Sequence, residues 1–209
     1  KAKTVDEAIA ALSGDVKIES RDKLHVNTDQ LTYKKDSEIA EAEEYIEFSR
    51  ENISGNAIGA IVDSRGKSIE LLKDVEITTV GAEGNETANI EYAKITSGHA
   101  FFDQTAEKIE FSENVFINII PKNDSSENLQ PTDINSNLAT ATFINKELDQ
   151  IDLKGDVFVY QKPSAKNPKW SKTRANRASA KIKKELKRVE LFENVDIETT
   201  AKQETPTKI

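Results

Sequence analysis

Apolar and polar residues alternate along most of this chain, and the alternation belongs to a unit that recurs. Four stretches superimpose without gaps, at residues 67–78, 107–118, 149–160 and 187–198. Each reads Ile or Val, an acidic residue, Leu or Phe, two variable residues, Asp or Asn, Val, one variable residue, and Ile or Val. With degenerate copies at 10–19 and 42–49, the valine position recurs about every 30 to 42 residues. Repeats of this length predict a stack built from one supersecondary unit.

The alternation has a period of two, which is the period of a β-strand with one buried face. In the second unit, Ile109, Phe111, Val115 and Ile117 are apolar and most residues between them are polar. The two variable residues and the Asp or Asn interrupt the alternation, and Asp, Asn and Gly tolerate the backbone of a tight bend or bulge. Each unit is therefore predicted to be a strand folded at an elbow, with the apolar faces of both arms turned inward.

Further alternating runs precede the units, at 24–33, 58–62, 90–95, 101–102, 138–143 and 178–182. We interpret them as antiparallel partner strands, which predicts an all-β fold. Three polar loops, at 80–87, 121–133 and 161–173, each follow the second half of a unit. They should therefore lie along one edge of the stack.

Two segments combine helical and strand features. Residues 4–12 carry a capping-box pattern, with Thr4 followed three residues later by Glu7, which favours a short helix, although a strand is nearly as well supported. The segment 181–188 has helical propensity, but its alternation continues into the fourth unit and favours a strand.

Composition narrows the classes of function. With 29 Lys and Arg against 37 Asp and Glu, the net charge of −8 disfavours nucleic acid as the main partner, because phosphate binding needs a basic surface. The absence of Cys and the presence of only two His exclude disulfides, thiolate chemistry and Cys- or His-rich metal sites. No apolar run approaches the length of a membrane span, and residues 1–6 lack the apolar core of a signal peptide.

The sequence also lacks the motifs of an enzyme. It has no G-x-S-x-G, Walker A, H-E-x-x-H or G-x-G-x-x-G pattern, so we predict a protein without catalytic activity or cofactor. Glu43 and Glu44 have the chemistry of a glycosidase pair, but in a chain so rich in Glu they are better interpreted as solvated surface residues. His25 and His99 lie far apart without a third ligand candidate and are predicted to be ordinary surface or edge histidines.

One stretch reverses the charge of the rest. Residues 162–188 contain eleven Lys and Arg and a single Glu. With one aromatic residue among them, they are candidates for contacts with anionic headgroups or an acidic partner. The alternative is a solvated loop and strand face that balances the acidic body. The candidate contact residues are Lys162, Lys166, Lys169, Trp170, Lys172, Arg174 and Arg177.

Together with the segment 24–78, the repeated units resemble the lipopolysaccharide-transport periplasmic family, the LptC, LptA and OstA group. Four successive strand patterns of that family are matched at 28–33, 39–48, 53–59 and 67–77. The resemblance is closest over residues 14–79 and continues as repeats to about residue 199. The repeats extend further than a minimal LptC-like domain needs, which suits an LptA-like or extended version. The membrane anchor usual in LptC-like members is not in this sequence.

The resemblance implies an elongated, repeat-built β-jellyroll of two antiparallel sheets, V-shaped in section and open at both ends. It implies an apolar groove that carries the acyl chains of lipopolysaccharide or a related envelope lipid toward the outer membrane, without enzymatic activity. It also implies a periplasmic location in the Gram-negative envelope, with anchoring through a further segment left open. The alternative is a structural or adhesive β-solenoid of the cell envelope with a dry core.

The groove residues would be the apolar positions of the repeated units. The interior candidates are Ile46, Phe48, Ile69, Leu71, Val75, Ile77, Ile109, Phe111, Val115, Ile117, Phe143, Ile151, Leu153, Val157, Val159, Val189, Leu191, Val195 and Ile197. The largest side chains should lie closest to an acyl chain, and these are Phe48, Phe111, Phe143 and Phe158 or its neighbours Val157 and Val159.

We expect three regions: an N-terminal lead-in at 1–13, a single jellyroll domain at 14–199 and a flexible tail at 200–209. An open stack leaves unpaired backbone groups on its first strand, near 15–19, and on its last, near 189–198. Such edges invite strand addition from a like-folded neighbour. Other jellyroll transport proteins are therefore predicted as partners, in head-to-tail order.

Overall fold

The computed structural model describes residues 8–19, 23–80, 90–122, 130–145, 147–183 and 185–200. Within these ranges the chain forms thirteen strands and no helix, which confirms the all-β class. The strands are β1 (Ile9–Glu19), β2 (His25–Lys34), β3 (Ile39–Arg50), β4 (Ile53–Asp63), β5 (Ser68–Val80), β6 (Ile90–Ser97), β7 (His99–Asp103), β8 (Lys108–Pro121), β9 (Thr132–Ile144), β10 (Glu147–Gln161), β11 (Ser171–Lys183), β12 (Glu185–Phe192) and β13 (Asp196–Thr199).

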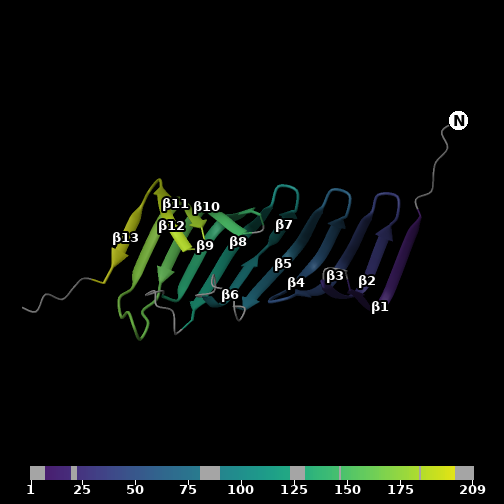
Figure 1. The fold of residues 1–209 in the computed structure, drawn as a ribbon, viewed down its shortest axis with the longest axis horizontal. Coiled ribbons are helices and arrows are strands. Elements are labelled where there is room, and N and C mark those ends of the chain that lie inside the picture. The colour runs from purple at the N-terminus through teal and green to yellow at the C-terminus, as the bar shows by residue number, and fades with distance from the viewer. Residues whose placement is uncertain are drawn as a thin grey trace, which may run out of the picture.

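The strands form one continuous antiparallel sheet whose members follow chain order along the length of the molecule (Figure 1). In two places a long strand pairs with two short ones. β6 and β7 together bridge β5 and β8, and β12 and β13 both pair with β11. The fold is an elongated β-jellyroll, as the resemblance implied. Its two expected sheets are joined into one, because the long strands bend and continue where separate sheets would end.

The bends lie at the predicted elbows. In β5, three residues separate the buried Leu71 and Val75, whereas only two separate the buried Ala57 and Ala60 on the neighbouring β4. The long strand therefore carries one extra residue, and the pairing register shifts at this point. An extra residue on one strand is a β-bulge, which bends the strand and strengthens its twist. We call the part of each long strand before the elbow its first arm and the part after it its second arm. The partner strands run in the opposite direction, and each of their halves takes the name of the arm with which it pairs.

Left-handed backbone at the elbows explains the Asp and Asn of the repeat. Asp15, Asp74 and Asp156 have φ values of 48°, 49° and 49°. Asp and Asn adopt this conformation more readily than most residues with a side chain. Gly155, with φ of 78°, precedes Asp156, and a Cβ there would lie 2.7 Å from the side-chain nitrogen of Asn137. Glu113 and Glu193 hold the same left-handed backbone at the equivalent positions, so at Gly155 it is the close side chain of Asn137 that favours glycine.

Three four-residue turns lie on one edge of the stack, and the longer connections lie on the other, together with the two-residue turn at 51–52 (Figure 1). Turns at 35–38, 64–67 and 104–107 join first arms, and we call this side the turn edge. The loop at 162–170 joins the second arms of β10 and β11, and we call that side the loop edge. The loops predicted at 80–87 and 121–133 leave and rejoin the sheet on the loop edge, although most of their residues lie outside the described part of the chain.

Both ambiguous segments are strands where they are described. Residues 9–12 belong to β1, which begins ahead of the domain start predicted at residue 14, while Thr4 and Glu7 lie outside the described residues. The segment 181–188 is shared between β11 and β12, which confirms the strand interpretation. The predicted tail beyond Thr200 is outside the described residues. The described part of the chain contains no helix of the length and hydrophobicity that a membrane span requires.

Candidate functional site

The inward-facing residues beside the elbows form a closely packed floor, with one row of side chains on each arm. The first-arm row is Ala42, Ala60, Leu71, Ala100, Phe111, Ala139, Leu153, Ala178 and Leu191. The second-arm row is Val16, Thr28, Ile46, Ala57, Val75, Ser97, Val115, Ser136, Val157 and Ala175. From β4 onward, large and small residues alternate between neighbouring strands, so the side chains interdigitate. Val75, Val115 and Val157 are each only 1% exposed.

A second pair of inward-facing rows lies two residues further from the elbows, and we call it the rim. The first-arm rim includes Ile69, Phe102, Ile109 and Ile151. The second-arm rim includes Phe48, Ile77, Ile95, Ile117, Ile134 and Val159. Apart from the buried Ile117, these side chains are partly buried and pack against the floor. The fold thus places a partly exposed apolar rim above a sealed apolar floor.

The structure brings most of the predicted interior residues to these two levels. Those that are buried are Ile46, Leu71, Val75, Phe111, Val115, Ile117, Leu153 and Val157. Those that are partly buried are Phe48, Ile69, Ile77, Ile109, Phe143, Ile151, Val159 and Leu191. Phe143 lies two residues beyond Ala141, near the turn edge and on the inward side of β9. Their role in a lipid groove stays a prediction.

The burial expected for Val189, Val195 and Ile197 is wrong, since they are 53%, 47% and 55% exposed. Register still places two of them on the inward face. Val189 pairs with Ala180 of β11, and Ile197 pairs with Thr173 of the same strand. They are exposed because β12 and β13 end the sheet formed by the described residues, in which no further strand covers them. They therefore line the open C-terminal end of the stack.

Phe158 was expected near the interior and instead lies on the outer face. It is adjacent to the inward-facing Val157 and Val159, so the alternation of the strand turns it outward. The Arg174 guanidinium carbon lies 5.1 Å from the centre of its ring. On the second arm of β10, the inward positions are therefore Val157 and Val159.

The sequence analysis missed the small residues that complete the floor. On the partner strands β4, β7, β9 and β11, every floor position of the first arm is alanine, and Ala100 is fully buried. The sequence does contain a signal for these residues. On the partner strands, two small residues are separated by two others across the elbow, as in Ala57 and Ala60 or Ser136 and Ala139. Hydropathy patterns overlook it because small residues occur in any context.

Three hydroxyl groups lie in this apolar floor. Thr28 donates to the carbonyl oxygens of Gln30 and Tyr45, at 3.3 and 3.1 Å. Ser97 donates to the carbonyl oxygen of His99, at 3.0 Å. These bonds satisfy backbone oxygens where the ladder is interrupted at the elbow. The buried Ser136 hydroxyl has no hydrogen-bond partner within the described part of the chain.

The basic stretch follows the outer face of β11 and the loop edge, and acidic residues from neighbouring elements oppose it. Arg174 Nη1 lies 3.6 Å from Asp196 Oδ2 of β13. Arg177 Nη2 lies 2.8 Å from Glu193 Oε1, between β12 and β13. Most of these groups are about half exposed, so each pair contributes little stability. The pairs nevertheless reduce the charge separation seen in the sequence.

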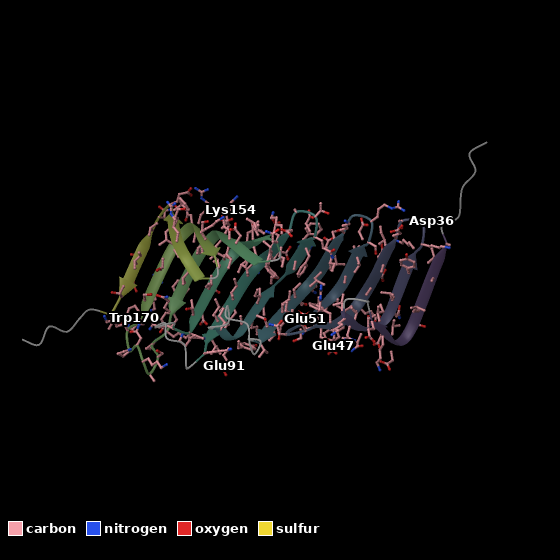
Figure 2. All side chains as sticks on the ribbon, viewed as in Figure 1. Asp36, Glu47, Glu51, Glu91, Lys154 and Trp170 are labelled. Atoms are coloured by element: carbon pink, nitrogen blue, oxygen red, sulfur yellow. The ribbon has the colours of Figure 1, made fainter. Side chains whose placement is uncertain are left out.

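At the loop edge the basic residues are Lys162, Lys166, Lys169 and Lys172. Trp170 lies among them in the sequence and is labelled at this end of the stack in Figure 2. Lys162 Nζ lies 2.6 Å from Asp133 Oδ2. Lys172 Nζ lies 5.2 Å from the centre of the Trp170 ring. Their predicted contact with headgroups or a partner stays a prediction.

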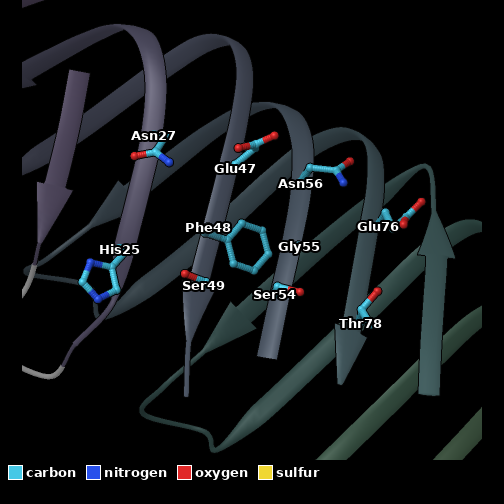
Figure 3. Close-up of a pocket in the computed structure, with 10 residues that line it drawn as sticks. All are labelled: His25, Asn27, Glu47, Phe48, Ser49, Ser54, Gly55, Asn56, Glu76 and Thr78. Carbon is cyan, nitrogen blue, oxygen red and sulfur yellow. The ribbon is translucent and has the colours of Figure 1, made fainter. Parts of the chain in front are cut away.

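A polar hollow of about 310 Å³ opens on the outer face of β2 to β5 (Figure 3). It is lined by His25, Asn27, Glu47, Phe48, Ser49, Ser54, Gly55, Asn56, Glu76 and Thr78. A hydrogen bond from Lys94 to Glu76 raises the pKa of Lys94 above its usual value. Burial, followed by the charge of Glu47, raises the pKa of the Tyr45 phenol. The lining is polar apart from Gly55 and Phe48, and Phe48 also belongs to the inward-facing rim.

The two histidines lie apart. His25 lines the polar hollow, whereas His99 Nε2 lies 2.8 Å from Glu70 Oε1 on the outer face of β5 and β7. In the described ranges, no group of three or more His, Cys, Asp or Glu residues is arranged to hold a metal ion. Glu43 and Glu44 are exposed at the elbow of β3.

Comparison with known proteins identifies the N-terminal part of this fold. Residues 1–80 match the model of a family described as lipopolysaccharide-assembly, LptC-related. The match ends with the last residue of β5 and so includes the first complete copy of the repeated unit. No curated protein matches the chain. The resemblance inferred from the repeats is thus confirmed over residues 1–80, where the chain is similar to the LptC-related family, a lipopolysaccharide-transport family of the Gram-negative periplasm.

Proposed function

We propose that the inner face is a non-enzymatic conduit for the acyl chains of lipopolysaccharide. The observation that carries this proposal is the unbroken second-arm rim. Ile77, Ile95, Ile117, Ile134 and Val159 are paired in register across five strands of three repeats. An acyl chain needs a continuous apolar surface and few specific polar contacts.

The division into floor and rim decides which residues an acyl chain contacts. The floor side chains already fill the space beside the elbows, so they stabilise the fold and leave no room for a ligand. The rim side chains retain exposed apolar area, and covering it with a lipid contributes roughly 25 cal/mol for each Å² removed from water. We therefore expect the lipid to lie on the rim, above the floor.

A photo-crosslinking residue at Ile77 is expected to capture lipopolysaccharide in cells, whereas one at Thr78 is not. Both belong to the second arm of β5, but Ile77 is on the inward rim and Thr78 lines the outer hollow. The measurement is the amount of lipopolysaccharide covalently attached to each purified variant.

A third variant at Val75 separates rim from floor. Because Val75 is 1% exposed, it should give little capture even though it faces inward. Capture at Thr78 and none at Ile77 would contradict the conduit. That result would favour a structural solenoid of the cell envelope, with a dry interior.

We further propose that copies of this fold, or like-folded partners, join end to end through β1 and the pair β12 and β13. These strands are the edges of the sheet within the described residues. Eleven strands follow one another in antiparallel order from β1 to β12, so the first and the last run in the same direction. A pair formed by β12 of one copy and β1 of the next would therefore be parallel. Continuing the rows places Leu12 beside Leu191 and Ile18 beside Ile197, which would extend the apolar surface across the junction.

The natural absence of cysteine makes this contact directly testable. Lys17→Cys in one copy and Asp196→Cys in another should form a disulfide, because both belong to the same outward row of the second arm. Neighbouring strands lie about 4.8 Å apart, within the range that a disulfide spans. Pairing Lys17→Cys with a cysteine at Glu110, in the middle of the stack, is the control. Equal cross-linking of both pairs would contradict end-to-end association.

A further inference from the structure

One amide side chain holds the basic loop from three sides. The Gln130 side-chain nitrogen lies 3.0 Å from the carbonyl oxygen of Lys162, 3.2 Å from that of Asn167 and 2.5 Å from that of Lys169. An amide nitrogen has two hydrogens, so three converging carbonyls use its full donor capacity. Gln130 precedes β9, whereas the loop at 162–170 joins β10 and β11, so the contact ties two connections together at the loop edge.

Other bonds fix the ends of the same loop. The backbone N–H of Lys162 donates to the carbonyl oxygen of Pro131, at 2.8 Å. The backbone N–H of Trp170 donates to the Thr200 hydroxyl, at 2.9 Å. Between them, the backbone N–H of Ser164 donates to the carbonyl oxygen of Asn167, at 2.8 Å. With the ends of the loop bonded to Pro131 and Thr200, Gln130 adds contacts from outside the loop to the carbonyl oxygens of Asn167 and Lys169.

Beside the held loop, Trp170 meets a cationic and aromatic group on the outer face of the second arm, formed by Tyr160 of β10 and Lys172 of β11. Lys172 Nζ lies 5.2 Å from the centre of the Trp170 ring and 5.7 Å from that of Tyr160. Attraction to the ring faces positions the ammonium while leaving N–H donors for an anion. Lys169 is exposed one residue before Trp170. Trp and Tyr rings beside lysines suit the boundary between apolar chains and charged headgroups.

We propose that Gln130 is a positioning residue that holds the loop at 162–170 so that Lys169 and Lys172 bind the phosphate of an anionic lipid headgroup. This inference rests on the proposed lipid-carrying function, because the second-arm rim ends at the loop edge, where Val159 lies two residues before the end of β10. A loop ordered in advance loses less conformational entropy when it binds, which strengthens binding without new contacts. Gln130 contributes by ordering the lysines and does not touch the lipid.

The test compares Gln130→Ala, the double variant Lys169→Ala/Lys172→Ala, and Gln150→Ala as the matched control. Among the described residues, the Gln150 amide bonds to Asp152 of its own strand, away from the loop. Two quantities are measured on each purified chain. Hydrogen exchange reports the order of residues 162–170, and co-sedimentation reports binding to phosphatidylcholine vesicles with and without phosphatidylglycerol.

Gln130→Ala should accelerate exchange in the loop by about tenfold or more and weaken binding to the anionic vesicles. The double lysine variant should keep a protected loop and lose roughly fivefold in anionic-vesicle binding for each lysine. Gln150→Ala should match the unmodified chain in both measurements. Binding to vesicles of phosphatidylcholine alone should change little in any variant.

Unchanged loop exchange in Gln130→Ala would overturn the positioning role. Unchanged anionic-vesicle binding in the double lysine variant would overturn the headgroup contact, as would equal competition by inorganic phosphate, which would indicate a free-anion site. Failure of the lipid conduit is distinguishable, because it appears as absent cross-linking at Ile77 while loop order and vesicle binding still respond as described.

Discussion

Replacing Val115 by Asp is expected to lower the free energy of unfolding by about 4 kcal/mol or more, enough to unfold much of the protein. Val115 is 1% exposed and lies in the floor, with Ser136 opposite it on β9. A carboxylate there loses its hydration, and no cation faces it from the floor rows. Urea unfolding followed by circular dichroism measures the change.

The matched control is Ser112→Asp on the same strand. Ser112 lies on the other side of the elbow, opposite His99, and its side chain is partly exposed on the outer face. Its carboxylate keeps contact with water, so the cost should stay below about 1 kcal/mol. Similar costs for the two variants would contradict the assignment of inward and outward faces.

Replacing Phe111 by Ala should cost about 3 to 5 kcal/mol, because it removes a large side chain from a packed interior. Phe111 is 5% exposed and lies between Ala100 and Ala139, which are too small to fill the space it would leave. It also meets Phe102 edge to face, with ring centres 6.3 Å apart. Thermal and urea unfolding of the purified variant measure the loss.

Phe101 provides the comparison, since it carries the same side chain on the opposite face. It is 37% exposed and pairs with Glu110, so Phe101→Ala should cost less than about 1 kcal/mol. If Phe101→Ala were as costly as Phe111→Ala, the interior would lie on the other face of the sheet. The proposed groove would then be misplaced.

The elbowed strands were predictable because their signal is local. A period of two follows from the pleat of a single strand, and the Asp or Asn before each valine marks the left-handed backbone of the bulge. The repeated unit then fixes the order of the stack, since each copy must bury its apolar face against the next. For the same reason the burial of Val75, Val115 and Val157 follows from the sequence pattern alone.

The partner strands were less predictable. Their floor positions are alanine, serine or threonine, residues too small to stand out by hydropathy, and their identity is set by the Leu, Phe or Val on the neighbouring strands. Ala100 is fully buried because Leu71 and Phe111 flank it. The need for a small residue at this position comes from packing between repeats, so the sequence of the single strand indicates it only weakly.

The sequence by itself determined the all-β fold, the elbows and the inward face, because these depend on backbone conformation and on the alternation within single strands. Only the tertiary structure decided how exposed each inward residue is and which charges meet. Val189 and Ile197 carry the same pattern as buried residues but lie on the last strands, so no further strand among the described residues covers them. Arg174 meets Asp196, and Gln130 reaches the basic loop, through pairings between strands far apart in sequence. Burial and ion pairing depend on what the rest of the chain places nearby, and a local pattern does not contain that information.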